Sequence, residues 1–200
     1  YGLSDRFRDA LEKAAAPAAT RLQTKKICFI GVWSFRKGSR DWPQLMEAIW
    51  RQQPATEFLL LGTMFDEETV RADLRVSQPE RVTCLPKYAA TELPALLADC
   101  TLALFPSYIE GFGLAVIEQL AAGLPTIADD VPGPRQMLPP DLLTPSGDTE
   151  KMAGRAAEIL SLPLADYAEL ASTCRALAGR YRWDEIAAAT IAEYNTTVES

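Results

Sequence analysis

Short apolar segments alternate with amphipathic ones from residue 27 to residue 144, and this alternation constrains the fold more than any other feature of the chain. The first apolar run, residues 27–32, is apolar at nearly every position, as is typical of a parallel strand covered on both faces. Further strands are expected at 57–62, 82–85, 101–105, 125–128 and 142–143, and helices at 41–53, 67–76, 91–99 and 114–122. Asp41 and Thr91 are the expected N-caps of two of these helices. Strands and helices that alternate in this way favour an α/β fold with a doubly wound parallel sheet.

Both ends of the chain are expected to be helical. An N-terminal helix is predicted from Asp5 to about Ala16, before Pro17 and a polar stretch that reaches Lys26. After residue 148 the chain is rich in alanine, and extra C-terminal helices are predicted at 149–160, 164–179 and 183–198. We therefore divide the chain into a linker with an N-terminal helix (1–25), a sheet domain (26–182) and a C-terminal helix (183–200).

The composition excludes several classes of protein. The 200 residues carry a net charge of -7 and have a pI of about 4.8, which argues against a general affinity for nucleic acid phosphates. The hydrophobic fraction of 48% is ordinary for a globular protein. No histidine is present, so neither a Ser-His-Asp nor a Cys-His centre can be built from these residues.

The cysteines favour a reduced compartment and argue against a metal site. Cys28, Cys84, Cys100 and Cys174 form no Cys-x-x-Cys pair, and a zinc site without histidine would need them clustered. No apolar run approaches the ~20 residues that span a bilayer, and no secretion leader is visible. A cytoplasmic protein is the simplest interpretation. The first residue is Tyr1 rather than Met, so we interpret the chain as a piece of a longer protein.

One predicted strand-to-helix turn carries two carboxylates and two glycines. Glu110 precedes Gly111 and Gly113, and Glu118 follows Glu110 by eight positions. Free backbone N–H groups and the positive end of the helix dipole meet at such a turn, and glycine lets a ligand approach the main chain. Helical side chains lean back toward the N-terminus, so the carboxylate of Glu118 could reach the same ligand. The motif therefore suits a bound anion with hydroxyl-bearing neighbours.

A second group of candidate residues follows the earlier strands. The loop that begins at Gly31 carries Arg36, which could donate a fork of hydrogen bonds, and Lys37, which could act as a point charge on a diphosphate. Gly62 ends the second strand, and Tyr88 follows the third. Ligands of such sheets bind at the carboxyl ends of the strands, so we expect these residues and the turn motif to face one crevice. The simplest ligand is a diphosphate attached to a group with hydroxyls.

Each motif has a simpler explanation when it is taken alone. Gly111 to Gly113 could be only a tight turn, Glu118 a solvated residue of an alanine-rich helix, and Lys37 part of a basic surface loop. Asp129-Asp130 is adjacent rather than spaced as a metal motif requires, and it is expected to cap or decorate a loop. A non-catalytic, flavodoxin-like binding module would explain the alternation equally well. It would not explain paired glutamates and a lysine loop at one edge of the sheet.

Four parts of the chain match one known pattern, namely a Glu-x7-Glu signature, its continuation, a Lys-Gly after the first strand and an aromatic-led last helix: Glu110 and Glu118, residues 119–128 and 131–133, Lys37-Gly38, and the helix from Trp183. In these parts the chain resembles the C-terminal, donor-binding domain of GT-B glycosyltransferases, especially those of glycosyltransferase family 4. The resemblance covers about residues 26–198. It implies a Rossmann-like, nucleotide-sugar-binding domain at 26–182 and a crossover helix at 183–200.

The resemblance implies a role for each candidate residue. Glu118 would hold the ribose hydroxyls, Glu110 would contact the transferred sugar, and Lys37 would bind the diphosphate, which makes Glu110 and Lys37 the catalytic candidates. The other donor-binding candidates are loop and main-chain groups: Gly111, Phe112, Gly113 and Leu114 around the diphosphate, Gly31 and Gly62 at strand ends, Arg36, and Tyr88 with Pro86 and Lys87 beside the base. The implied enzyme is a retaining glycosyltransferase of the hexosyltransferase type that uses a UDP or GDP sugar and needs neither a metal nor a cofactor.

One departure from the family concerns the diphosphate. Many relatives carry arginine directly after the glycine of the first strand, where this chain has Val32. Arg36 could compensate from its different place on the same loop. A GT-B epimerase of sugar nucleotides is an alternative function, whereas a phosphorylase is disfavoured because no lysine suits pyridoxal phosphate. The base, sugar, acceptor and linkage stay open.

The resemblance also implies two partners. One is the nucleotide-sugar donor, and the other is an N-terminal, acceptor-binding domain through which any association with a membrane surface would come. Without that domain the acceptor cannot be positioned, so the isolated piece is expected to be inactive. The last helix is expected to pack across to the same domain, which would leave its apolar stripe partly exposed here: Ile186, Ala189, Thr190 and Tyr194.

Overall fold

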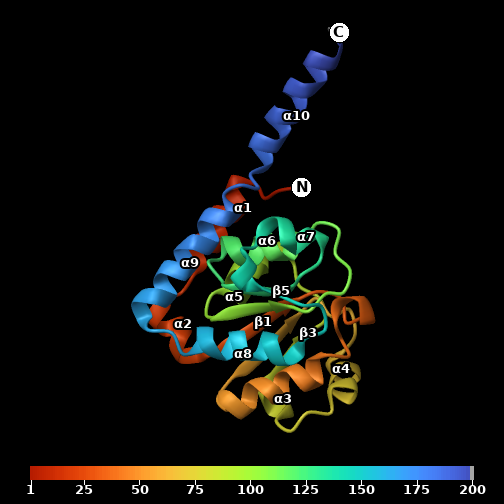
Figure 1. Ribbon diagram of the computed structural model, residues 1–200, viewed down its shortest axis with the longest axis vertical. Coiled ribbons are helices and arrows are strands. Elements are labelled where there is room, and N and C mark those ends of the chain that lie inside the picture. Colours follow the sequence, from red (N-terminus) through yellow and green to blue (C-terminus); the bar gives the residue numbers. More distant parts are fainter. Residues whose placement is uncertain (199–200) are drawn as a thin grey trace.

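The computed structural model describes residues 1–198 and confirms a doubly wound α/β fold around a six-stranded sheet (Figure 1). The strands are β1 (Lys26–Ile30), β2 (Glu57–Leu61), β3 (Val82–Leu85), β4 (Leu102–Phe105), β5 (Thr126–Asp129) and β6 (Leu143–Thr144). Their order is β3-β2-β1-β4-β5-β6, and every neighbouring pair is parallel. All residues of β4 and β5 are buried, as expected for strands that helices cover on both faces.

Helices form a layer on each face of the sheet (Figure 1). On one face α3 (Trp42–Gln52) packs against α8 (Thr149–Leu160). On the other, α6 (Leu114–Ala121) packs against α9 (Leu164–Ala178), and α1 (Asp5–Ala14) packs against α5 (Leu93–Leu97). The remaining elements are α2 (Ala18–Thr24), α4 (Glu67–Leu74), α7 (Pro132–Met137), α10 (Trp183–Val198) and short 3-10 turns at Phe35–Lys37, Pro79–Arg81, Ala90–Glu92 and Pro140–Leu142.

The predicted elements are found within two residues of their expected bounds, but the details of the helix starts differ. Thr91 does not cap a helix, because it lies inside a 3-10 turn and α5 begins only at Leu93. Asp41 occupies the N-cap position of α3, yet its carboxylate makes no capping hydrogen bond. Two helices, α2 and α7, lie where none was predicted. Residues 199–200 of the predicted C-terminal segment lie outside the described residues.

Arg21 anchors α2, which lies in the polar stretch before β1, to the rest of the fold. Its side chain is buried, with 1% of the residue exposed. The Nε atom donates to the carbonyl of Ala98 at 3.0 Å, and Nη1 donates to the carbonyl of Ala122 at 2.9 Å. These two residues end α5 and α6, where a cation is favourable to the helix dipoles. Burial lowers the pKa of Arg21. Arg21 thus joins α2 to two helices that come much later in the chain.

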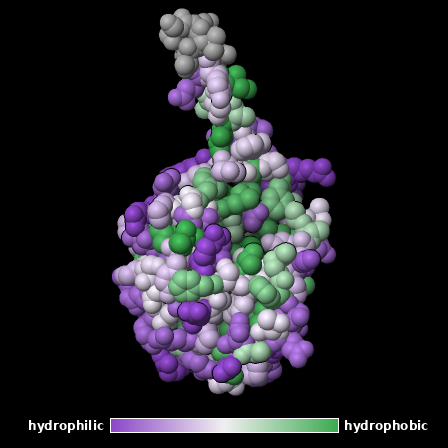
Figure 2. All heavy atoms as spheres, turned by 90° about the vertical axis from the view of Figure 1, so that its right-hand side faces the viewer, coloured by the Kyte–Doolittle hydropathy of each residue, from purple (hydrophilic) through white to green (hydrophobic). Residues whose placement is uncertain are grey.

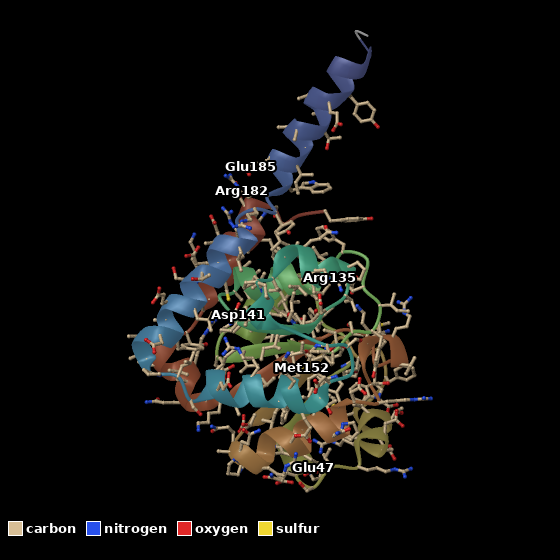
Figure 3. All side chains as sticks on the ribbon, viewed as in Figure 1. Glu47, Arg135, Asp141, Met152, Arg182 and Glu185 are labelled. Atoms are coloured by element: carbon tan, nitrogen blue, oxygen red, sulfur yellow. The ribbon has the colours of Figure 1, made fainter. Side chains whose placement is uncertain are left out.

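Helix α10 projects away from the rest of the molecule (Figure 1). Arg182, just before it, donates to the two carboxylate oxygens of Asp5 at 3.1 and 2.7 Å and to Glu185 at 2.8 Å (Figure 3). The predicted apolar stripe is half-buried at its first member, Ile186, and exposed at the others, with Tyr194 70% exposed. Neither α10 nor any other helix within residues 1–198 combines the length and apolarity needed to cross a bilayer.

We expect Arg21→Met to lower the free energy of unfolding by about 2–4 kcal/mol, because the buried carbonyls of Ala98 and Ala122 lose their donor. Urea unfolding followed by circular dichroism measures the change. Arg51→Met is the matched control, since the side chains of Arg51 and its partner Glu150 are 61% and 60% exposed. The control should stay within about 0.5 kcal/mol of the wild type. Equal losses in the two variants would contradict the structural role of Arg21.

Candidate active site

A crevice is expected at the carboxyl ends of β1 and β4, where the strand order reverses direction along the sheet. β1 pairs with β2 on one side and with β4 on the other, so the chain leaves β1 and β4 toward helices on different faces of the sheet. This is the usual position of ligands in open α/β sheets. Residues 31–41 form the loop after β1, and residues 106–113 form the loop after β4. Figure 2 faces this edge of the molecule and shows apolar side chains gathered among hydrophilic ones.

Lys37 and Glu110 meet across these two loops. The Nζ atom of Lys37 donates a hydrogen bond to Oε2 of Glu110, and each side chain is only 18% exposed. The ammonium also lies 4.8 Å from the centre of the Phe105 ring. Ion pairs in partly buried places are less screened by solvent than surface pairs. The two catalytic candidates, which are 73 residues apart in the chain, therefore lie together.

Backbone contacts hold the same two loops together. The N–H of Tyr108 donates to the carbonyl of Arg36 at 3.0 Å. Gly38 has a φ of +77°, and a Cβ on it would lie 2.0 Å from the carbonyl oxygen of Pro106. No other residue type would allow this approach, because the backbone conformation and the space both require glycine. The Lys-Gly pattern thus has a steric cause as well as a chemical one.

The start of α6 is open to an anion. Gly113 occupies the N-cap with a φ of +96°, and among residues 1–198 no side chain caps this helix. A Cβ on the neighbouring Gly111 would meet nothing within 4 Å. Leu114 is the first helical residue and is 43% exposed. On the inner side, the N–H of Gly133 donates to the carbonyl of Glu110 at 3.1 Å and supports the turn. The first N–H groups of α6 are thus available to a ligand.

Glu118, Tyr88 and Gly62 form a second part of the site. Burial raises the pKa of Glu118 to about 7, so its carboxylate does not point into bulk water. Burial, followed by the charge of Glu118, raises the pKa of Tyr88 to about 12, which places the two side chains near each other. Gly62 has a φ of +71°, and a Cβ on it would lie 3.4 Å from the Tyr88 ring. Three predicted donor-binding residues from three different loops or helices therefore share one region.

The remaining predicted residues lie in or beside the same loops but contact Lys37 and Glu110 less directly. A Cβ on Gly31 would lie 2.8 Å from the ring of Phe29, so a side chain here would require that ring to move. Arg36 is exposed, and the hydrogen bond described for it uses its backbone carbonyl. Val32 is 45% exposed. The ring of Phe112 contacts those of Tyr1 and Tyr181 at 5.2 and 5.9 Å between centroids, which leaves its main chain at the turn.

Asp129 differs from its sequence-based prediction. It is the last residue of β5 rather than part of a loop, and it is 1% exposed. Burial raises its pKa to about 6, although Ser146 donates a hydrogen bond to it at 3.2 Å. Its position at the end of an apolar strand was the signal that could have revealed it. Within residues 1–198, no three His, Cys, Asp or Glu side chains gather in a way that could hold a metal ion.

The raised pKa of Glu118 predicts a pH-dependent stability. Folding favours the protonated acid, so this contribution to stability is complete below pH 4.5 and is lost as the pH rises to about 7. Between these pH values we expect the free energy of unfolding of the wild type to fall by roughly 1–3 kcal/mol relative to that of Glu118→Gln, because the glutamine does not titrate. Urea unfolding at a series of pH values measures the difference. Asp129 titrates in both proteins, so its contribution cancels in the difference between the two unfolding free energies. Parallel curves for the two proteins would show that Glu118 is solvated.

Comparison with known proteins identifies the family. Residues 24–162 match the family described as Glycosyl transferases group 1. The chain is 27% identical to GDP-mannose:cellobiosyl-diphosphopolyprenol alpha-mannosyltransferase of Xanthomonas campestris, over 94% of this chain and 51% of that protein. It is 26% identical to glycogen synthase of Mycobacterium tuberculosis, over 94% of this chain and 47% of that protein. The chain thus spans about half the length of these curated relatives.

Solved structures agree with this family. Sucrose-phosphate synthase from Thermosynechococcus elongatus matches with a TM-score of 0.75 and 25% identity, over 94% of this chain and 50% of that one. Anabaena HepE, solved in complex with UDP and glucose, matches in fold with a TM-score of 0.73 and 22% identity, over 98% of this chain and 53% of that one. The family match includes the loops after β1 and β4 as well as α6. The chain therefore belongs to the group 1 glycosyl transferases and has the fold of the C-terminal domain of GT-B enzymes.

Proposed function

We propose that this chain is the donor-binding half of a retaining hexosyltransferase that takes its sugar from a nucleoside diphosphate. The observation that carries the proposal is the meeting of Lys37 and Glu110 beside the uncapped start of α6. A lysine and free helix N–H groups suit a diphosphate, whereas a carboxylate suits the hydroxyls of a sugar. Retention of the sugar's configuration follows from the family resemblance and is part of the proposal.

Lys37 would act on the leaving group. When the bond between the sugar and the diphosphate breaks, negative charge grows on the diphosphate oxygen. The ammonium of Lys37 and the N-terminus of α6 would stabilise this charge, and they are already in place before the reaction. The main chain of Gly111 to Leu114 would line the same oxygens, and Arg36 would supply a second cation in place of the family arginine that Val32 replaces. With these positive groups, we propose that the reaction needs neither a metal nor a cofactor.

Glu110 would hold the transferred sugar. In the structure its carboxylate accepts a hydrogen bond from Lys37, and its backbone carbonyl is fixed by the N–H of Gly133. A donor bound between the loops would offer its diphosphate to Lys37 and its sugar hydroxyls to Glu110. Lys37 would then bind the charged part of the ligand, and Glu110 would bind its hydroxyl-bearing part.

Glu118, Tyr88 and Gly62 would bind the nucleoside. A half-buried carboxylate can accept two hydrogen bonds from the ribose hydroxyls, and the Tyr88 ring would lie beside the base. The Xanthomonas relative is named for GDP-mannose, and Anabaena HepE was solved with UDP. These names support a UDP or GDP sugar as the donor.

A second domain would complete the enzyme. The chain spans about half the length of its curated relatives. The edge of the sheet that carries the site also exposes large apolar residues on three loops and one helix start (Figure 2): Val32, Phe35, Met64, Phe65, Ile109 and Leu114. An acceptor-binding domain that faces this edge would cover these residues, and α10 would pack against the same domain. Without it the acceptor cannot be oriented, so we propose that residues 1–200 alone transfer no sugar. The family match argues against a flavodoxin-like module, and an epimerase remains the alternative.

We expect residues 1–200 to bind UDP or GDP without added metal, and Lys37→Ala or Glu118→Ala to weaken this binding about 10- to 100-fold. The first variant removes a charge partner of the diphosphate, and the second removes the acceptor for the ribose. Isothermal titration calorimetry measures the affinities. Exposed residues on α8 and α4 give the matched controls Lys151→Ala and Glu68→Ala, which should bind like the wild type. No binding of either nucleotide at millimolar concentration would rule out the donor-binding function.

In the full-length enzyme we expect Glu110→Gln to lower kcat roughly 10- to 100-fold and to change the KM for the donor less than about threefold. The amide keeps the shape of the side chain but removes its charge and its second strong acceptor. Transfer assays against a panel of nucleotide sugars give both constants. An unchanged kcat would remove Glu110 from the sugar site, and an epimerised free donor would favour the alternative function.

A further inference from the structure

Tyr108 lies where loops from four strands meet. Its hydroxyl donates to Oδ1 of Asp41, from the loop after β1, at 3.0 Å. A Cβ on Gly147, in the loop after β6, would lie 3.1 Å from the same hydroxyl oxygen, so that loop packs against the tyrosine. Burial, then the hydrogen bond to Asp41, then the charges of Asp41 and of Asp129 at the end of β5, raise the pKa of Tyr108 to about 12. Tyr108 itself follows β4.

The Tyr108 ring supports the loop that carries Lys37. It is stacked on the ring of Phe35, with 5.3 Å between the centroids and 18° between the planes. The guanidinium of Arg40 lies over the ring of Phe35 at 5.0 Å. Phe35 nevertheless remains 56% exposed, so the stack adds little to the hydrophobic core. The stack joins the loop after β1 to the loop after β4.

The backbone of Tyr108 adds a third contact to the same loop. Its N–H donates to the carbonyl of Arg36 at 3.0 Å. Arg36 directly precedes Lys37, and Tyr108 precedes Glu110 by two residues. The ring, hydroxyl and backbone of one residue therefore hold both loops at the point where Lys37 and Glu110 meet.

Asp41 is committed to this contact rather than to its own helix. It sits at the N-cap of α3, where an aspartate normally accepts a hydrogen bond from the helix backbone. Here its carboxylate makes no capping bond and accepts from Tyr108 instead. Its other oxygen is buried and has no partner among the described residues. The carboxylate of Asp41 therefore joins two loops instead of capping α3.

We propose that Tyr108 is a positioning residue of the diphosphate site: by holding residues 31–41 against residues 106–113, it places Lys37 where charge develops on the leaving group. This inference rests on the proposed donor-binding function and extends it. Tyr108 acts through Lys37 and not on the donor. Its removal should therefore weaken binding of the diphosphate without affecting binding of the nucleoside.

The test combines Tyr108→Phe, which keeps the ring and removes only the hydroxyl, with Lys37→Ala. UDP and GDP are titrated by calorimetry into the wild type, both single variants and the double variant, and uridine and guanosine serve as ligands without a diphosphate. We expect Tyr108→Phe to weaken UDP or GDP binding about 3- to 10-fold in the wild type. It should change binding less than twofold when Lys37 is already absent, and it should leave nucleoside binding unchanged.

Variants of Asp41 provide the rescue control. Asp41→Asn keeps an oxygen that can accept the tyrosine hydrogen bond and should bind UDP or GDP within about twofold of the wild type, whereas Asp41→Ala should match Tyr108→Phe. Tyr194→Phe, on the exposed part of α10, is the matched tyrosine control and should have no effect. Thermal unfolding confirms that every variant is folded.

A measurement without ligand separates this proposal from the donor-binding function. Hydrogen exchange should become faster in residues 34–39 and 107–111 of Tyr108→Phe and stay unchanged in β4 and α3. Unchanged exchange in both loops would overturn the proposal, whether or not nucleotides bind. Equal weakening by Tyr108→Phe with and without Lys37, or an equal loss of uridine and guanosine binding, would overturn it as well. If the wild type binds no nucleotide, the donor-binding function fails, and hydrogen exchange alone decides whether Tyr108 holds the loops.

Discussion

The hydrogen bonding of β1 to β4 is the constraint on which the rest of the site depends. Ile27 pairs with Leu102 and Cys28 with Ala103, and all four residues are fully buried. A shift of one residue in this pairing would move the loop after β1 by about 3.3 Å relative to the loop after β4. Such a shift is far larger than the few tenths of an ångström over which a hydrogen bond keeps its length, so Lys37 and Glu110 could meet only with changed side-chain conformations. The apolar packing of two strands thereby sets the distance between two charged groups.

Burial also shapes the chemistry of the crevice edge. The carboxyl groups of Glu118 and Asp129 have pKa values of about 7 and about 6, and in both cases loss of water is the main cause. Such carboxyls destabilise the folded protein near neutral pH, and proteins carry this cost mainly at functional sites. The low local dielectric that raises these pKa values would also strengthen the attraction between Lys37 and a bound anion. Tyr108 lies at the same edge of the sheet. Its hydroxyl donates to the carboxylate of Asp41, which makes no capping bond to α3, and this contact joins two loops.

Much of the fold and part of the site could be predicted from the sequence. The strand runs were visible from their continuous apolar character, and the rule that ligands lie at the carboxyl ends of parallel strands was enough to predict one crevice for Lys37 and Glu110. α2 was missed because Arg21 looks like a surface residue, and its burial depends on carbonyls 77 and 101 residues away. Asp41 was assigned a capping role by its local pattern, but Tyr108, 67 residues away, binds its carboxylate.

By itself, the sequence determined the order of strands and helices, the parallel character of the sheet and the residue types at the strand ends. These properties follow from apolar spacing, glycine positions and the short range of backbone hydrogen bonding. Only the tertiary structure decided which of those residues meet, that Arg21 and Asp129 are buried, and that Tyr108 holds the loop of Lys37. The physical reason is that desolvation and side-chain hydrogen bonds depend on neighbours from distant parts of the chain, and packing alone brings these together.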